Sequence, residues 1–175
     1  MKIADQRKAI DAALDTYRNQ LDTIPDELFT VTPPGGGWSL AEVYSHILQA
    51  TIGSTIALER CINGTCEPTK KGLTPLGRLV LFFNRFPPVR VKTPAIEAAK
   101  LVITKLTKEE AKNLLVKCRR RVDEITPRIN GSSPQSRYKH SRLGMMNAGQ
   151  WFEFVLIHLQ HHLKQIERIK NKFSI

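Results

Sequence analysis

Three of the five histidines in this 175-residue sequence lie close together near the C-terminus, in the stretch VLIHLQHHLKQIERI. They are His158, His161 and His162. In a helix each residue turns the side-chain direction by about 100°, so His158 and His162 lie only about 40° apart on one face. Most apolar residues of the segment share that face, whereas His161 falls to one side. We therefore expect His158 and His162 to face the core and His161 to lie at its edge or in solvent.

Two imidazoles four residues apart on a core face are a ready pair of metal ligands, as in HExxH motifs. Neutral imidazole binds zinc, nickel, copper or iron, and a bound ion offsets the cost of burying two polar rings. The alternative is a pair of core histidines satisfied by other hydrogen bonds. The spacing alone leaves both interpretations open.

A third histidine, His46, lies far earlier in the chain, in WSLAEVYSHILQA. The helical face around it is made of small side chains, which leaves space beside the ring, as a pocket requires. Those neighbours are Val43, Ala50, Gly53 and Ala57. Glu42 lies one turn before His46 and is a candidate fourth ligand or general base, although a capping position already explains it. The remaining histidine, His140, falls in a predicted loop.

Four amphipathic helices must position these residues. Apolar residues at helical spacing predict helices over 3–21, 39–61, 107–126 and 147–170. The last three open with capping patterns: SLAE at 39–42, TKEE at 107–110, and an asparagine and a glutamine at 147 and 150. A long Pro- and Gly-rich connection joins the second and third helices and holds a short apolar segment at 76–83. The expected fold is all-α, a four-helix bundle forming one domain over 1–175.

Strand signals are weak. Only VRV at 89–91 hints at a strand, and residues 127–144 are predicted to be loop.

Composition narrows the function classes. The longest purely apolar run, LVLFF, is far shorter than a membrane span, and the N-terminus lacks the apolar stretch of a signal peptide, so we expect a cytoplasmic protein with no membrane partner. Three cysteines are too few for a disulfide framework and are interpreted as reduced thiols. Residues 69–175 carry 22 Lys and Arg against 7 Asp and Glu. These cations are scattered without interleaved aromatics, which favours a solvated basic face over nucleic-acid binding.

WSLAEVYSHI followed about a hundred residues later by HLQHHLKQI resembles the DinB-like superfamily, also known as YfiT-like proteins. The matching residues are a tryptophan and a serine that open the second helix, a histidine within it, and H-x-x-x-H-x-x-Q on the fourth helix. They are Trp38, Ser39, His46, His158, His162 and Gln165. The stretch HSRLGMMNAGQWFEF is similar to a subgroup of uncharacterised members.

The resemblance implies a four-helix bundle, frequently a homodimer, with a three-histidine metal site. Carried over, the ligands are His46, His158 and His162, which bind a divalent ion such as zinc or nickel. Gln165 would orient a ligand from the second coordination shell. Characterised relatives include transferases and isomerases that use a low-molecular-weight thiol such as bacillithiol, mycothiol or glutathione.

These expectations leave several functions open. A thiol S-transferase acting on a small-molecule substrate is the first, and its acidic thiol could be held by basic residues of the 85–92 or 137–142 segments. The others are a hydrolase that activates water, for which Glu42 is the one nearby carboxylate, and a non-catalytic metal-binding module related to stress. DNA binding through the basic half has no recognition motif to support it.

Overall fold

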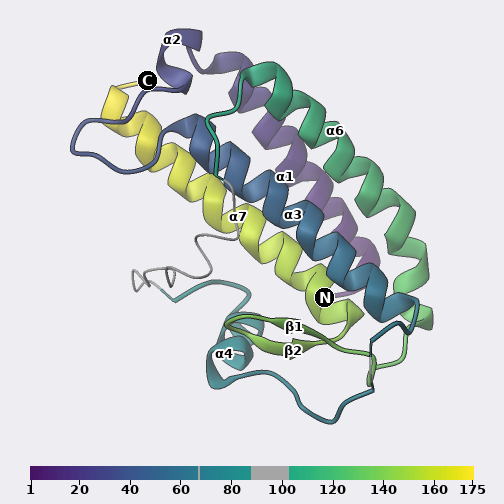
Figure 1. Ribbon diagram of the computed structural model, residues 1–175. Helices are drawn as coiled ribbons and strands as arrows, with labels where there is room; N and C mark the ends of the chain where they lie inside the picture. The colour runs from purple at the N-terminus through teal and green to yellow at the C-terminus, as the bar shows by residue number, and fades with distance from the viewer. Residues whose placement is uncertain (67, 88–102) are drawn as a thin grey trace.

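The computed structural model describes residues 1–66, 68–87 and 103–175. Within them four long helices pack side by side (Figure 1). These are α1 (Ile3–Thr23), α3 (Leu40–Ile62), α6 (Lys108–Ile125) and α7 (Ala148–Phe173). The predicted all-α four-helix bundle is confirmed, and each helix ends within about three residues of its predicted end. No described helix is both long enough and apolar enough to cross a membrane.

All three predicted capping patterns form. The hydroxyl of Ser39 accepts the N–H of Glu42, while the Glu42 carboxylate accepts the backbone N–H of Ser39 at 2.8 Å. The same reciprocal pairing opens α6 at Thr107 and α7 at Asn147. Each box satisfies N–H groups that a helix start leaves without partners, and so fixes where the helix begins and which face it buries.

Two buried tyrosines tie the helices together in the core. The Tyr17 hydroxyl donates to the carbonyl of Leu159 at 2.8 Å and so joins α1 to α7. The Tyr44 hydroxyl donates to the carbonyl of Tyr17 at 2.8 Å, and the two rings meet edge to face. Because buried hydroxyls are costly without partners, these bonds favour one alignment of α1, α3 and α7.

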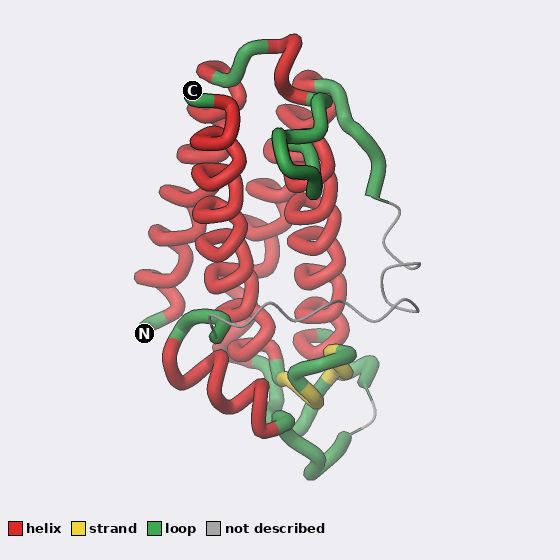
Figure 2. Tube along the Cα trace, turned by 90° about the vertical axis from the view of Figure 1, so that its left-hand side faces the viewer, coloured by secondary structure: helices red, strands yellow, loops and turns green. Residues whose placement is uncertain are grey.

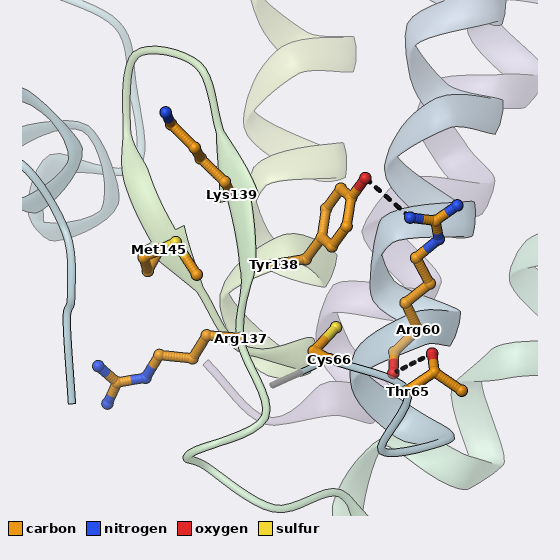
Figure 3. A pocket seen from close by; sticks show the side chains of 7 residues that line it. All are labelled: Arg60, Thr65, Cys66, Arg137, Tyr138, Lys139 and Met145. Atoms are coloured by element: carbon orange, nitrogen blue, oxygen red, sulfur yellow. Dashed lines mark hydrogen bonds between the residues drawn. The ribbon is translucent and has the colours of Figure 1, made fainter. Parts of the chain in front are cut away.

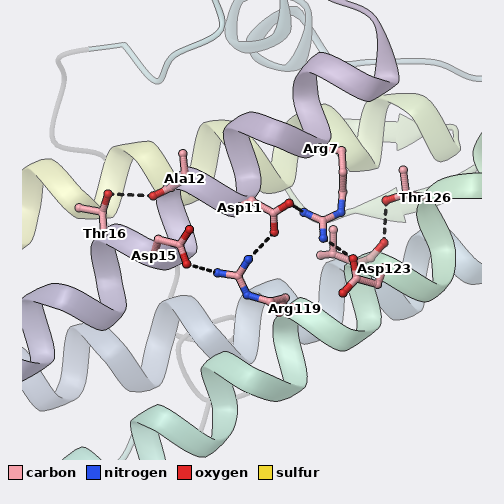
Figure 4. A network of polar contacts seen from close by, with 9 residues as sticks. Arg7, Asp11, Ala12, Asp15, Thr16, Arg119, Asp123 and Thr126 are labelled. Carbon is pink, nitrogen blue, oxygen red and sulfur yellow. Dashed lines mark hydrogen bonds and ion pairs between the residues drawn. The ribbon is translucent and has the colours of Figure 1, made fainter.

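Ion pairs join α1 to α6 on the outer side of the bundle (Figure 4). The Arg119 guanidinium contacts Asp11 at 2.6 Å and Asp15 at 2.5 Å, and Arg7 contacts both Asp11 and Asp123. A network of this kind is worth more than isolated surface pairs because one guanidinium serves two carboxylates.

The connections hold more structure than the sequence predicted. The apolar segment at 76–83 is a helix, α4 (Pro75–Phe83), and a short helix, α2 (Asp26–Phe29), follows α1. The loop predicted over 127–144 is wrong in part. It begins with a 3₁₀ helix, η1 (Thr126–Gly131), and continues into an antiparallel hairpin of β1 (Tyr138–His140) and β2 (Gly144–Met146) (Figure 2). The strand suggested at 89–91 lies outside the described residues.

The hairpin forms because α4 and its leading segment pack against it. The Thr74 N–H donates to the carbonyl of Leu143 at 2.9 Å, and the Met145 N–H donates to the carbonyl of Gly72 at 3.0 Å. A Cβ atom at Gly77 would lie 2.2 Å from the Leu143 carbonyl oxygen. These contacts join segments about 70 residues apart, which local sequence patterns do not report.

Alanine at Gly77 is expected to destabilise the protein by about 1–3 kcal/mol, because its methyl group cannot fit against the Leu143 backbone. Alanine at Gly53 is the matched control, since it also lies in a helix but faces open space. That change should stabilise α3 by about 0.5–1 kcal/mol. Urea unfolding of both variants measures the difference, and equal effects would contradict the close packing of α4 on the hairpin.

Candidate metal centre

The structure brings three histidines together between two neighbouring helices. His46 comes from α3, and His158 and His162 come from α7. One ring nitrogen of each lies within 4.8 Å of the others, and the ring centroids are 4.6–5.3 Å apart. Among the described residues this group contains no carboxylate and no cysteine.

Hydrogen bonds orient the two rings on α7. The Nδ1–H of His162 donates to the side-chain oxygen of Gln165 at 2.7 Å, which leaves the lone pair of His162 on Nε2. That Nε2 atom lies 3.0 Å from Nε2 of His158. Gln165 therefore sets the tautomer of His162, the part that a second-shell residue plays in metal sites.

Burial keeps all three imidazoles neutral at physiological pH. Desolvation, with a smaller contribution from neighbouring histidines, lowers the pKa of His46 to about 4 and that of His162 to about 3. Burial also holds the pKa of His158 well below its ordinary range, with His162 and His46 contributing. Because only the neutral ring offers a lone pair, the cluster is ready to bind a cation without first losing protons.

The residues fit a metal ion. Nitrogens that share a zinc ion at about 2.0–2.1 Å lie roughly 3 Å apart, which is the Nε2 spacing of His158 and His162. A hydrogen bond between these two rings would satisfy one nitrogen each, but it leaves out His46, whose buried Nδ1 has no hydrogen-bond partner in the protein. The Nδ1 atom of His158 also has none, and because Nε2 of that ring faces the cluster, a bound ion would not change this. The paired-histidine alternative therefore accounts for less of the geometry than a shared cation does.

Three aromatic side chains surround the cluster. The Phe154 ring stacks on His158 with centroids 5.2 Å apart, and the Trp38 ring lies 5.2 Å from that of His46. Phe86, from the connection after α4, lies 6.0 Å from the ring of His158. Sequence reasoning missed Phe154 and Phe86. Phe154 had a signal, since it stands four residues before His158 on the same helical face, whereas nothing local marks Phe86.

The other predicted residues take different positions. His161 is exposed, as its helical phase predicted. His140 belongs to β1, where its Nδ1 accepts the N–H groups of Arg142 and Leu143, and it is not part of the cluster. The Glu42 carboxylate is engaged by Ser39, from both the backbone N–H and the hydroxyl at 2.8 Å, so its capping role is confirmed.

The fold and the cluster together define the class: a four-helix bundle with a three-histidine candidate metal site between facing helices. The DinB superfamily matches residues 9–166, and the chain belongs to this superfamily. A search among curated proteins gave no match.

Two solved structures share the fold. The chain is 18% identical to TT2238, described as a four-helix bundle protein, over 95% of this chain and 99% of that one, with a TM-score of 0.61. It is 12% identical to YfiT from Bacillus subtilis, described as a probable metal-dependent hydrolase with an unusual four-helix bundle topology, over 99% of this chain and 88% of that one, with a TM-score of 0.64. At these identities the likeness establishes the fold alone.

Metal-free protein is expected to lose stability as the pH falls. The folded-state pKa values of His46 and His162, about 4 and about 3, lie below the ordinary 6.5 that unfolding restores. Between pH 6.5 and these values the unfolded chain binds more protons than the folded chain, so the free energy of unfolding decreases toward acid. Urea unfolding of metal-free protein at about pH 7 and about pH 5 measures this slope.

The control replaces both residues by asparagine, which cannot titrate. The His46→Asn, His162→Asn variant should show a flatter pH dependence, and His161→Asn should keep most of the wild-type slope. An unchanged slope in the double variant would show that these histidines are not buried as neutral rings.

Proposed function

We propose that this protein is a metal-dependent enzyme in which His46, His158 and His162 hold one divalent ion, zinc or nickel. The observation that carries the proposal is the convergence of three neutral imidazoles, one ring nitrogen of each lying within 4.8 Å of the others. Three protein ligands leave positions open for a small molecule, which is the arrangement of catalytic rather than structural sites. The similarity to YfiT, described as a probable metal-dependent hydrolase, supports the same general class.

We further propose that the nucleophile is a low-molecular-weight thiol, transferred to a small electrophilic substrate. A divalent ion in this site would lower the pKa of a bound thiol and present it as a thiolate. The protein's own residues position the ligands: Gln165 orients His162, and Phe154 and Trp38 pack against the other two rings. These aromatic rings limit water around the nucleophile and offer an apolar wall to the electrophile.

Two cations on α7 support the proposal that the bound thiol carries acidic groups. Burial is the main cause that lowers the pKa of His161, and the charges of Arg168 and Lys164 add to it. Burial likewise lowers the pKa of His162, with Arg168 as the smallest contribution, so both cations lie near this part of the helix. Two of the basic residues expected to hold the thiol have contacts within the protein. Arg137 donates to the carbonyl of Lys71 at 2.6 Å, and the Arg85 guanidinium lies over the Phe83 ring. Residues 88–92 lie outside the described residues.

Hydrolysis is the second candidate, favoured by the description of YfiT. It requires a general base near the bound water. Among the described residues no carboxylate joins the histidine cluster, and Glu42 is held by Ser39. We therefore rank thiol transfer above hydrolysis. The homodimer expected from the resemblance stays a prediction.

The ligand assignment predicts how zinc affinity changes. Alanine at His46, His158 or His162 should lower it by at least about 100-fold, because each removes a direct ligand. Leucine at Gln165 should lower it by about 10–100-fold through loss of the hydrogen bond to His162. Competition against a chromophoric zinc chelator measures these constants. His161→Ala is the control, and an equal loss there would show that the ligand set is wrong.

The choice of nucleophile predicts a thiol-dependent activity. Zinc- or nickel-loaded protein should consume an aromatic electrophile only with bacillithiol, mycothiol or glutathione, and His162→Ala should abolish the reaction. The double variant Lys164→Gln, Arg168→Gln should have a higher KM for the acidic thiol and an unchanged KM for the electrophile. Ester hydrolysis without thiol that also requires His162 would instead favour the hydrolase.

A further inference from the structure

Two segments far apart in the sequence form one end of the molecule, which we call the cap: residues 68–87, which include α4, and residues 132–147, which include the hairpin (Figures 1 and 2). Backbone hydrogen bonds join them, from the Thr69 N–H to the carbonyl of Gln135 at 3.2 Å and from the Met145 N–H to the carbonyl of Gly72 at 3.0 Å. The cap is therefore one continuous surface.

Seven cations and no carboxylate belong to the cap. Its cations are Lys70, Lys71, Arg78, Arg85, Arg137, Lys139 and Arg142. The ion pairs among the described residues all involve the bundle helices, α2 or η1, and none includes a cap residue. Cations that looked scattered in the sequence thus gather at one end, and none of them forms an ion pair within the described part of the chain.

Figure 3 shows how the hairpin distributes this charge. Tyr138 points toward Arg60 of α3 and accepts its hydrogen bond at 2.9 Å, while Arg137 and Lys139 leave β1 on the other side. A hollow of about 580 Å³ lies around these residues and reaches Cys66. The outer side of β1 therefore presents its cations away from the bundle.

The outer face of α4 is apolar. Leu79, Phe82 and Phe83 follow the i, i+3, i+4 spacing of one helical face and are 44%, 79% and 52% exposed. The opposite face is buried through Val80 and Leu81. Leu79 and Phe82 also border a shallow hollow of about 420 Å³ that Pro75 and the Arg78 side chain complete. A solvent-exposed pair of phenylalanines beside two arginines that form no ion pair with any described residue is unusual for a surface that contacts only water.

We propose that the cap is a docking surface for an anionic lipid bilayer. Aromatic and leucine side chains on a short amphipathic helix enter the acyl boundary, while surrounding Lys and Arg residues meet acidic headgroups. Arg78 borders the same hollow as Leu79 and Phe82, and the Arg85 guanidinium lies over the Phe83 ring, so both contributions arise in one place. The expectation of no membrane partner rested on the lack of a spanning segment, which surface docking does not need.

Two other occupants fit less well. A second copy of the chain would bring seven uncompensated cations against seven more in a symmetric contact, which repels. Nucleic acid would meet the cations but would gain little from burying Leu79, and the two phenylalanines stand on a convex helix rather than in a groove that tracks a backbone.

Sedimentation with vesicles tests the proposal. Protein loaded with zinc should bind phosphatidylcholine vesicles containing about 30% phosphatidylserine at least tenfold more tightly than pure phosphatidylcholine vesicles. Phe82→Ser with Phe83→Ser should weaken binding about tenfold or more. Arg78→Gln with Arg85→Gln should weaken it about fivefold per cation removed, and salt should weaken the wild type.

Matched controls lie on the bundle. Val116→Ser removes an exposed apolar side chain from α6, and Lys8→Gln with Arg18→Gln removes two exposed cations from α1, so neither should change binding. Unchanged helix content and zinc content establish that each variant is folded. The proposal is overturned if wild-type protein ignores acidic vesicles, or if the controls weaken binding as much as the cap variants. It is also overturned if the Phe variants abolish self-association or DNA binding while vesicle binding is absent.

Discussion

Burying three imidazole rings between α3 and α7 is the constraint on which the rest of this structure depends. Neutral rings in a desolvated space need hydrogen-bond partners for their nitrogens. Gln165 provides one such partner, for Nδ1 of His162. The buried Nδ1 atom of His46 has no partner in the protein. A cation shared by His46, His158 and His162 would offset the burial cost that the bundle otherwise bears, so the site couples function to stability.

The surrounding contacts fix how α3 and α7 are rotated about their own axes. If α7 rotated by one residue, His161 rather than His162 would face His46. The capping box at Asn147 sets the start of α7, and the bond from Tyr17 to Leu159 fixes it beside His158. The box at Ser39 does the same for α3, and it uses the carboxylate of Glu42 in doing so. The start of α3 is therefore well defined, and the carboxylate of Glu42 is occupied and cannot act as the general base.

Helices, caps and histidine phase could be predicted because each depends on residues within about four positions of one another. The same reasoning placed His161 outside the cluster. The hairpin and α4 were missed because their partners are distant: Gly77 and Leu143 touch across 66 positions, and β2 contains no β-branched residue. The sequence did not predict that the cations gather at the cap, for the same reason. They lie close together only because two loops far apart in the sequence pair with each other.

The central claim is that this bundle holds a metal through three histidines. Elemental analysis of protein purified without an affinity tag or chelator, repeated on the His162→Ala variant, tests it most directly. The account predicts about one zinc, nickel or similar ion per wild-type chain and a large loss in the variant. Wild-type protein that contains no metal and takes up none when zinc is added would contradict it, and the three histidines would then be part of the core alone.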